Sequence, residues 1–127
     1  RLRPNINRPP ISAISLATDT STLTACGNDY NFSDIFLRPF NGLVKKNDVL
    51  FAITTSGNSK NIIKVLKEAQ KKNIYSVVLL GKGGGLAKNL CNDKIIVKSK
   101  NTAIIQETHI FLGHYILENV ENNIIKN

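Results

Sequence analysis

Apolar and polar positions along this 127-residue chain follow two different periods. Short apolar runs that are rich in β-branched residues predict strands at residues 11–17, 49–54, 75–80 and 94–98. Apolar positions at helical spacing predict helices at residues 20–25, 33–44, 60–72, 86–90 and 102–122. Pro39 falls inside the second of these helices, and we expect it to kink that helix or to end it early.

This alternation predicts an α/β fold, a three-layer αβα sandwich in which helices cover both faces of a four-stranded parallel sheet. Polar loops follow the predicted strands at residues 18–22, 54–59 and 81–85. Because parallel strands place their carboxyl ends at one edge of a sheet, where ligands of open α/β folds bind, these loops are expected to surround one site. Nothing in the sequence suggests a repeat or an interdomain linker, so residues 1–127 are expected to form one domain.

The loop at residues 54–59 reads Thr-Thr-Ser-Gly-Asn-Ser and joins a predicted strand to a predicted helix. Such a junction presents free backbone N–H groups and hydroxyl donors to one point, an arrangement that binds phosphate. The loop lacks the Gly-Lys-Ser/Thr of a nucleotide P-loop, which favours a monophosphate over a nucleoside triphosphate. The simpler alternative is an ordinary helix cap, in which Ser59 caps a helix that starts near Lys60.

The glycine-rich segment at residues 81–85 invites comparison with the dinucleotide-binding fingerprint G-x-G-x-x-G. Leu86 occupies the position of the third glycine of that fingerprint. The segment is therefore only a weak indication of a dinucleotide site.

The chain carries 17 basic and 9 acidic residues, and this net charge of +8 favours phosphates and other acidic partners. The lysines of the predicted helix 60–72 recur opposite its apolar positions, which indicates one solvated face. The chain has no tryptophan and does not interleave aromatic with basic residues, so nucleic-acid binding is disfavoured. A nucleic-acid function predicts retention on DNA that falls steeply with salt.

Other features of the composition suggest the cellular setting. Cys26 and Cys91 lie far apart without clustered histidines, which predicts reduced, buried thiols rather than a disulfide or a zinc finger. The sequence shows neither a signal peptide nor a membrane-spanning run, so a soluble cytoplasmic protein is expected. Because the chain begins with Arg1 and contains no methionine, we expect it to be a fragment of a longer product.

Several stretches, taken together and in order, resemble the sugar isomerase (SIS) domain and, within it, the phosphoheptose isomerases. The matching stretches are residues 16–24, 27–30, 42–50, 54–61 and 105–110, with His114. The Ser-Gly-Asn-Ser sequence at residues 56–59 alone indicates the wider domain, which has a flavodoxin-like sheet. Its combination with Gln-Glu-x-His at residues 106–109 points to the phosphoheptose isomerases.

The resemblance implies an aldose–ketose isomerase that converts sedoheptulose 7-phosphate to D-glycero-D-manno-heptose 7-phosphate, a precursor of bacterial surface heptose in lipopolysaccharide. Members of the family are homotetramers with active sites between subunits, and several bind zinc. By matching motif, the phosphate is expected on Thr54, Thr55, Ser56 and Ser59. The sugar chain is expected on Asn28 and Asp29. The reacting end is expected on Gln106 and His114 as zinc ligands, with Gln106 also in contact with the substrate and His114 also an acid/base.

Isomerisation needs such groups, because moving a carbonyl between C1 and C2 requires a base, a proton donor and an electrophile that stabilises the enediolate. A histidine can act as acid or base, and zinc can polarise both oxygens. Gln106 and His114, however, stand eight residues apart, about 12 Å along a helix axis and about 80° around it. They can share one ion only if their side chains converge or if different subunits supply them, and zinc needs further ligands. His109 matches a non-ligand position and is predicted to be structural.

The chain also departs from the family pattern. It has no counterpart of the family's N-terminal region, whose Gly-Asn-Gly-Gly-Ser loop precedes a helix with a histidine ligand and a glutamate acid/base. Residues 99–104 replace a stretch that usually carries two aspartates and an arginine. We therefore expect residues 1–127 to be a single SIS domain that lacks its N-terminal helical segment. The alternative is a non-catalytic scaffold or sugar-phosphate-binding regulator, such as the relatives that assemble on a replication-initiation protein.

Overall fold

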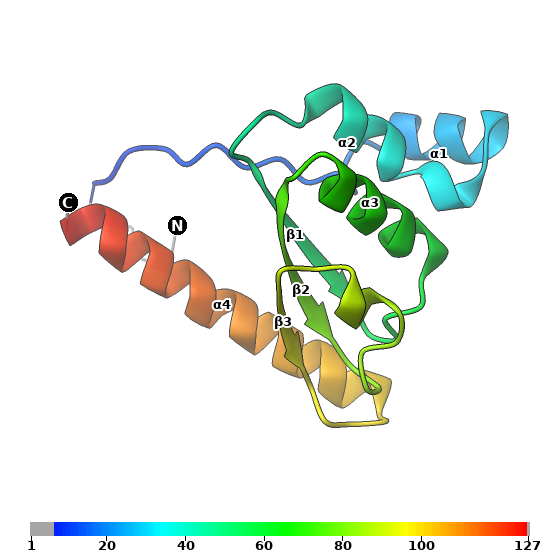
Figure 1. The fold of residues 1–127 in the computed structure, drawn as a ribbon. Helices are drawn as coiled ribbons and strands as arrows, with labels where there is room; N and C mark the ends of the chain where they lie inside the picture. Colours follow the sequence, from blue (N-terminus) through cyan, green and yellow to red (C-terminus); the bar gives the residue numbers. More distant parts are fainter. Residues whose placement is uncertain (1–6, 127) are drawn as a thin grey trace.

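Three parallel strands form the sheet in the computed structural model, which describes residues 7–126 (Figure 1). The strands are β1 (Val49–Thr54), β2 (Tyr75–Leu80) and β3 (Asp93–Ile96), in the order β1-β2-β3. The register runs from Val49 opposite Tyr75 to Thr54 opposite Leu80, and from Val77 opposite Asp93 to Leu80 opposite Ile96. All the strands point the same way, so their carboxyl ends lie at one edge of the sheet, as predicted.

Helices lie on both faces of this sheet, in agreement with the layered α/β architecture, but the side chains of Val49, Phe51 and Ile53 on one face of β1 stay exposed (Figure 1). One face carries α1 (Thr20–Asp29), α2 (Leu37–Leu43) and α3 (Lys60–Lys71), and α4 (Thr102–Lys126) crosses the other. The main core lies between α3 and the sheet. Val65, Leu66 and Ala69 of α3 pack there with Val78 and Leu80 of β2. The lysines of α3 point to solvent, as the sequence predicted.

The strand predicted at residues 11–17 is wrong, and the described sheet has three strands rather than four. A strand exists only where its backbone groups find a partner edge. Residues 12–17 instead line a cavity of about 970 Å³, together with residues 49–53 of β1 and with apolar side chains of the α2 region and α3. Within residues 7–126, the segment therefore lies beside β1 without pairing to it.

The helix predicted at residues 33–44 is interrupted, as Pro39 suggested, but on the amino-terminal side of the proline. The segment forms a 3₁₀ turn, η1 (Phe32–Asp34), and then α2, in which Pro39 is the third residue. Proline is tolerated in a first turn because the N–H groups there have no intrahelical acceptor. The helix predicted at residues 86–90 is likewise only a 3₁₀ turn, η2 (Ala87–Asn89).

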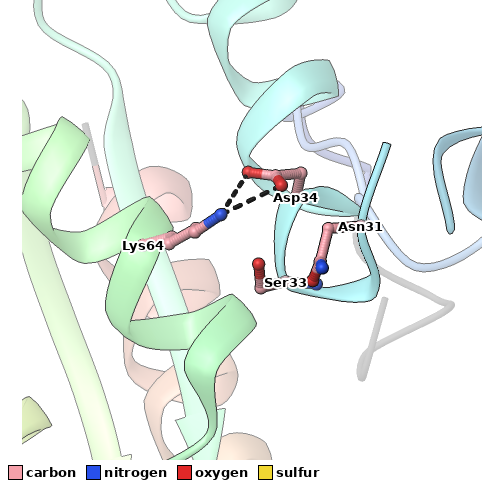
Figure 2. Close-up of polar contacts among 4 residues, drawn as sticks. All are labelled: Asn31, Ser33, Asp34 and Lys64. Carbon is pink, nitrogen blue, oxygen red and sulfur yellow. Dashed lines mark hydrogen bonds and ion pairs between the residues drawn. The ribbon is translucent and has the colours of Figure 1, made fainter. Parts of the chain in front are cut away.

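An ion pair joins η1 to α3 (Figure 2). Lys64 Nζ lies 2.9 Å from both carboxylate oxygens of Asp34, and the Asn31 side chain accepts the N–H of Ser33 at the start of the turn. Lys64 is well exposed, so the pair is expected to contribute at most about 1 kcal/mol and to serve mainly as a positional tie.

At the other end of the molecule, Arg8 Nε donates to Glu121 Oε1 at 2.7 Å, which fixes the amino-terminal segment to the end of α4. Cys26 and Cys91 are both free thiols, as predicted; Cys26 is buried and Cys91 is partly buried. Among residues 7–126, no helix has both the length and the apolar character that crossing a bilayer requires.

Candidate functional site

The turn at residues 54–59, here called the cradle, lies between the carboxyl end of β1 and the first turn of α3. Thr54 is buried, and its Oγ1 accepts the N–H of Gly57 at 3.3 Å and lies 3.3 Å from Ser59 Oγ. Ser56 Oγ accepts the N–H of Asn58 at 3.1 Å. These contacts fold the turn back on itself and hold its hydroxyl groups close together.

The amino-terminal end of α3 adds backbone donors to this turn. Ser59 occupies the N-cap position, but its side chain makes no capping hydrogen bond, so the simple helix-cap interpretation of this serine is wrong. Its hydroxyl faces Thr54 instead. The N–H groups of Lys60 and Asn61, the first residues of α3, have no intrahelical acceptor and carry the positive end of the helix dipole. Two neighbouring hydroxyls, those of Thr54 and Ser59, therefore lie at the amino-terminal end of a helix, a combination that suits an anion such as phosphate.

The segment at residues 81–86 forms a second wall against the cradle. The Leu86 N–H donates to Asn58 Oδ1 at 3.0 Å, and the Ala87 N–H donates to the Gly57 carbonyl at 2.9 Å. Sequence reasoning did not identify these partners of the cradle. The available signal was the run of glycines at residues 83–85, which indicated a close approach of backbone without saying to what.

Asn28 and Asp29, the predicted sugar contacts, lie at the carboxyl end of α1 and are exposed. Asn28 Nδ2 donates to Asp29 Oδ1 at 2.9 Å. Helix α1 packs against η1, on the α3 side of the sheet, whereas α4 lies on the opposite side (Figure 1). Within the described chain, no hydrogen bond or ion pair connects this pair of residues to the cradle or to α4.

The polar loop at residues 18–22 is used to start α1. Asp19 is the N-cap residue, and its carboxylate accepts both the N–H and the hydroxyl of Thr22. These hydrogen bonds favour the ionised carboxylate and lower the pKa of Asp19 below its usual range. The carboxylate is thus engaged in capping.

Helix α4 begins next to the cradle. A Cβ placed on Gly81 would lie 2.6 Å from the Ile105 side chain and 2.8 Å from the Thr55 carbonyl, so these two residues meet at the end of β2. Gln106 is the next residue of α4, and it is exposed. His114 lies two turns further along and is also exposed.

His109 is 2% exposed and confirms its predicted structural role. Its Nε2 lies 3.1 Å from the Leu80 carbonyl, so Nε2 carries the proton and donates it to the end of β2. This contact ties α4 to the end of β2.

The described residues do not fit a zinc site within one chain. No group of three or more histidine, cysteine, aspartate or glutamate side chains gathers anywhere in residues 7–126. Gln106 and His114 supply two donors, on a regular helix that keeps them about 12 Å apart along its axis. Zinc takes four ligands, so the remainder must come from elsewhere.

Comparison with known proteins places this geometry in context. A family model described as the SIS domain matches residues 3–81. The phosphoheptose isomerase of a Nitratiruptor species is 45% identical over 116 residues, which are 91% of this chain and 62% of that protein. The phosphoheptose isomerase of Campylobacter concisus is 47% identical over 114 residues, 90% of this chain and 60% of that protein.

Two solved structures of phosphoheptose isomerases have the same fold as this chain. A phosphoheptose isomerase from Francisella tularensis superimposes with a TM-score of 0.83 at 40% identity, over 87% of this chain and 60% of that one. The phosphoheptose isomerase GmhA from Neisseria gonorrhoeae superimposes with a TM-score of 0.83 at 39% identity, over 86% of this chain and 62% of that one. The chain therefore spans about three-fifths of the length of these relatives.

Proposed function

The chain belongs to the SIS domain family, and from this premise we propose that it is part of an isomerase that converts sedoheptulose 7-phosphate to D-glycero-D-manno-heptose 7-phosphate. The observation that supports this most directly is the cradle at residues 54–59. It places the Thr54 and Ser59 hydroxyls 3.3 Å apart at the start of α3, where backbone N–H groups favour an anion such as phosphate. The phosphoheptose isomerases that this chain resembles act on a sugar that carries such a group.

In this proposal the cradle holds the phosphate end of the substrate through Thr54, Thr55, Ser56 and Ser59. Fixing the phosphate orients the chain of the sugar, and it is binding energy at this remote group that positions the reacting carbons. His114 is the candidate acid/base, and Gln106 is a candidate contact at the reacting end. Asn28 and Asp29 are the candidates for the hydroxyls between the two ends.

The zinc ion implied by the resemblance remains part of this proposal only with ligands from outside the described residues. When bound, it supplies an electrophile that polarises the carbonyl and hydroxyl oxygens. The donors described in this chain do not complete such a site on their own. We also propose that the isomerase acts in the cytoplasm, toward the heptose of bacterial surface polysaccharide.

We further propose a homotetramer with active sites between subunits. The candidate residues lie on both sides of the sheet, with Asn28 and Asp29 on α1 and with Gln106 and His114 on α4 (Figure 1). Within the described residues no hydrogen bond or ion pair joins these two pairs, which is consistent with a site that is completed by a second chain. Helix α4 also leaves large apolar side chains exposed at Ile104, Ile110, Phe111, Tyr115, Leu117 and Val120. Such a surface is typical of a protein interface.

Replacing Phe111 by glutamate is expected to shift the protein from the tetramer to smaller species, because Phe111 is 67% exposed and a charge in a buried apolar interface is costly. Sedimentation velocity measures this directly. The matched control is Phe32→Glu, since Phe32 is 70% exposed but lies in η1, on the other side of the sheet. A tetramer that withstands F111E, or that is lost equally in F32E, contradicts the placement of the interface on α4.

The proposed activity is tested by incubating the full-length parent of this chain with sedoheptulose 7-phosphate, with and without zinc, and following the heptose product by NMR. Ser59→Ala is expected to weaken substrate affinity by about 10- to 100-fold, since a hydrogen bond to a charged group is worth about 1.5–3 kcal/mol. Ser21→Ala, at an exposed serine of α1, is the control and is expected to change nothing. Binding without turnover favours the non-catalytic regulator, and the absence of both binding and turnover rejects the isomerase.

A further inference from the structure

The loop at residues 81–86, here called the glycine loop, has an unusual backbone. Lys82, Gly83, Gly84 and Gly85 all have positive φ, at 49°, 79°, 84° and 52°. Left-handed residues usually occur singly, and a run of them persists only where the surrounding structure fixes it. The partner that fixes this run is the cradle.

Hydrogen bonds join the glycine loop and the turn that follows it to the cradle. The Asn58 side chain accepts the N–H of Leu86 through Oδ1 at 3.0 Å. The Gly57 carbonyl accepts the N–H of Ala87 at 2.9 Å. The cradle is therefore hydrogen-bonded to a segment that lies 28 residues away in sequence and follows the neighbouring strand β2.

The cradle and the glycine loop approach each other so closely at Gly57 and Gly85 that neither position has room for a Cβ atom. A Cβ on Gly57 would lie 2.0 Å from the Gly84 carbonyl oxygen. A Cβ on Gly85 would lie 2.6 Å from both the Ser56 carbonyl and Asn58 Oδ1. Glycine at positions 57 and 85 is thus what lets the two loops touch. Gly83 differs, because it shares the left-handed backbone but has open space where its Cβ would stand.

We propose that the glycine loop is the positioning element of the cradle, and that Asn58 and Gly85 are positioning residues for phosphate binding. This inference rests on the proposed function, because it takes the cradle to be the phosphate site. Donors that must converge on one anion lose affinity when any of them moves by a fraction of an ångström. In this proposal Asn58 and Gly85 hold residues 56–58 against the glycine loop and are not themselves ligands of the phosphate.

The test compares the variants Asn58→Ala, Gly85→Ala and Gly83→Ala in the full-length parent of this chain. Inorganic phosphate and sedoheptulose 7-phosphate are titrated into each by calorimetry, and the stability of each variant is measured by urea denaturation. Asn58→Ala, which removes one hydrogen bond, is expected to weaken both ligands about fivefold. Gly85→Ala adds a methyl group that would clash with the Ser56 carbonyl and Asn58 Oδ1 of the cradle, and it is expected to lower the affinity for both ligands at least tenfold. Gly83→Ala imposes similar backbone strain without the contact, and its affinity is expected to stay within about twofold.

In the turnover assay, the Asn58→Ala change is expected in KM and not in kcat, because the reacting end of the substrate is untouched. The inference is overturned if Asn58→Ala and Gly85→Ala bind both ligands as tightly as Gly83→Ala does. If Gly85→Ala does not fold, Asn58→Ala decides the matter, since Asn58 is exposed and its truncation leaves the core intact. A different result, in which the unchanged chain binds neither ligand, rejects the proposed function itself.

Discussion

Replacing Gly57 by alanine is expected to lower the free energy of unfolding by about 3–5 kcal/mol. Gly57 has a φ of +66°, which an alanine adopts only with strain. The added methyl group would also lie 2.0 Å from the Gly84 carbonyl oxygen. Both partners are backbone, so relief requires the cradle and the glycine loop to separate. That movement breaks the hydrogen bond between the Ala87 N–H and the Gly57 carbonyl. Phosphate affinity is expected to fall with it.

Urea denaturation measures this change, and Gly113→Ala supplies the matched control. Gly113 lies within α4, and a Cβ there would meet nothing within 4 Å. Alanine is favoured over glycine inside a helix, so this variant is expected to gain about 0.5–1 kcal/mol. If Gly57→Ala remains within about 1 kcal/mol of the unchanged chain, the cradle and the glycine loop are not packed as described.

The sequence predicts the cradle but not the glycine loop that supports it. The cradle was identified because its signal is local, a strand followed by hydroxyl residues and then a helical pattern. The support of the cradle was not identified, because Asn58 and Leu86 come together only when β1 and β2 pair in register. A glycine run indicates close backbone approach, but the sequence does not name the partner. This part of the site therefore required the fold.

The fold itself was predictable where burial decides the structure. The strands at residues 49–54 and 75–80 were predicted with the bounds observed for β1 and β2, because each is an apolar run closed by polar turn residues. Residues 11–17 show a similar apolar pattern and yet form no strand. Side-chain pattern reports which residues avoid water, but a strand also needs a neighbour with unpaired backbone groups. The sequence of residues 11–17 alone does not show whether such a neighbouring strand is available.

The candidate residues outside the cradle came from resemblance alone. Nothing local distinguishes Gln106 and His114 from other exposed polar residues of a helix, and the structure leaves both exposed on α4. Asn28 and Asp29 lie on the other side of the sheet (Figure 1). In the proposed tetramer a second chain would bring these residues to one ligand, and the test with Phe111 addresses that assembly.

Replacing His109 by alanine is expected to lower the free energy of unfolding by about 2–4 kcal/mol, because it leaves a cavity under α4 and removes a buried hydrogen bond. His109 is 2% exposed, and its Nε2 donates to the Leu80 carbonyl at 3.1 Å. That carbonyl also accepts the N–H of Val97 at 2.8 Å, so the substitution does not leave it without a partner. The expected loss therefore comes mainly from packing. Chemical denaturation of the variant measures it.

His114→Ala is the matched control, since it removes the same side chain from the same helix at an exposed position, and it is expected to stay within about 0.5 kcal/mol. His109→Leu separates packing from hydrogen bonding. Nδ1 of His109 is buried without a partner among the described residues, a cost that leucine removes while it refills the cavity. The leucine variant is therefore expected to lose less stability than the alanine variant. Equal losses in H109A and H114A contradict the role of His109 as the residue that fixes α4 on the end of β2.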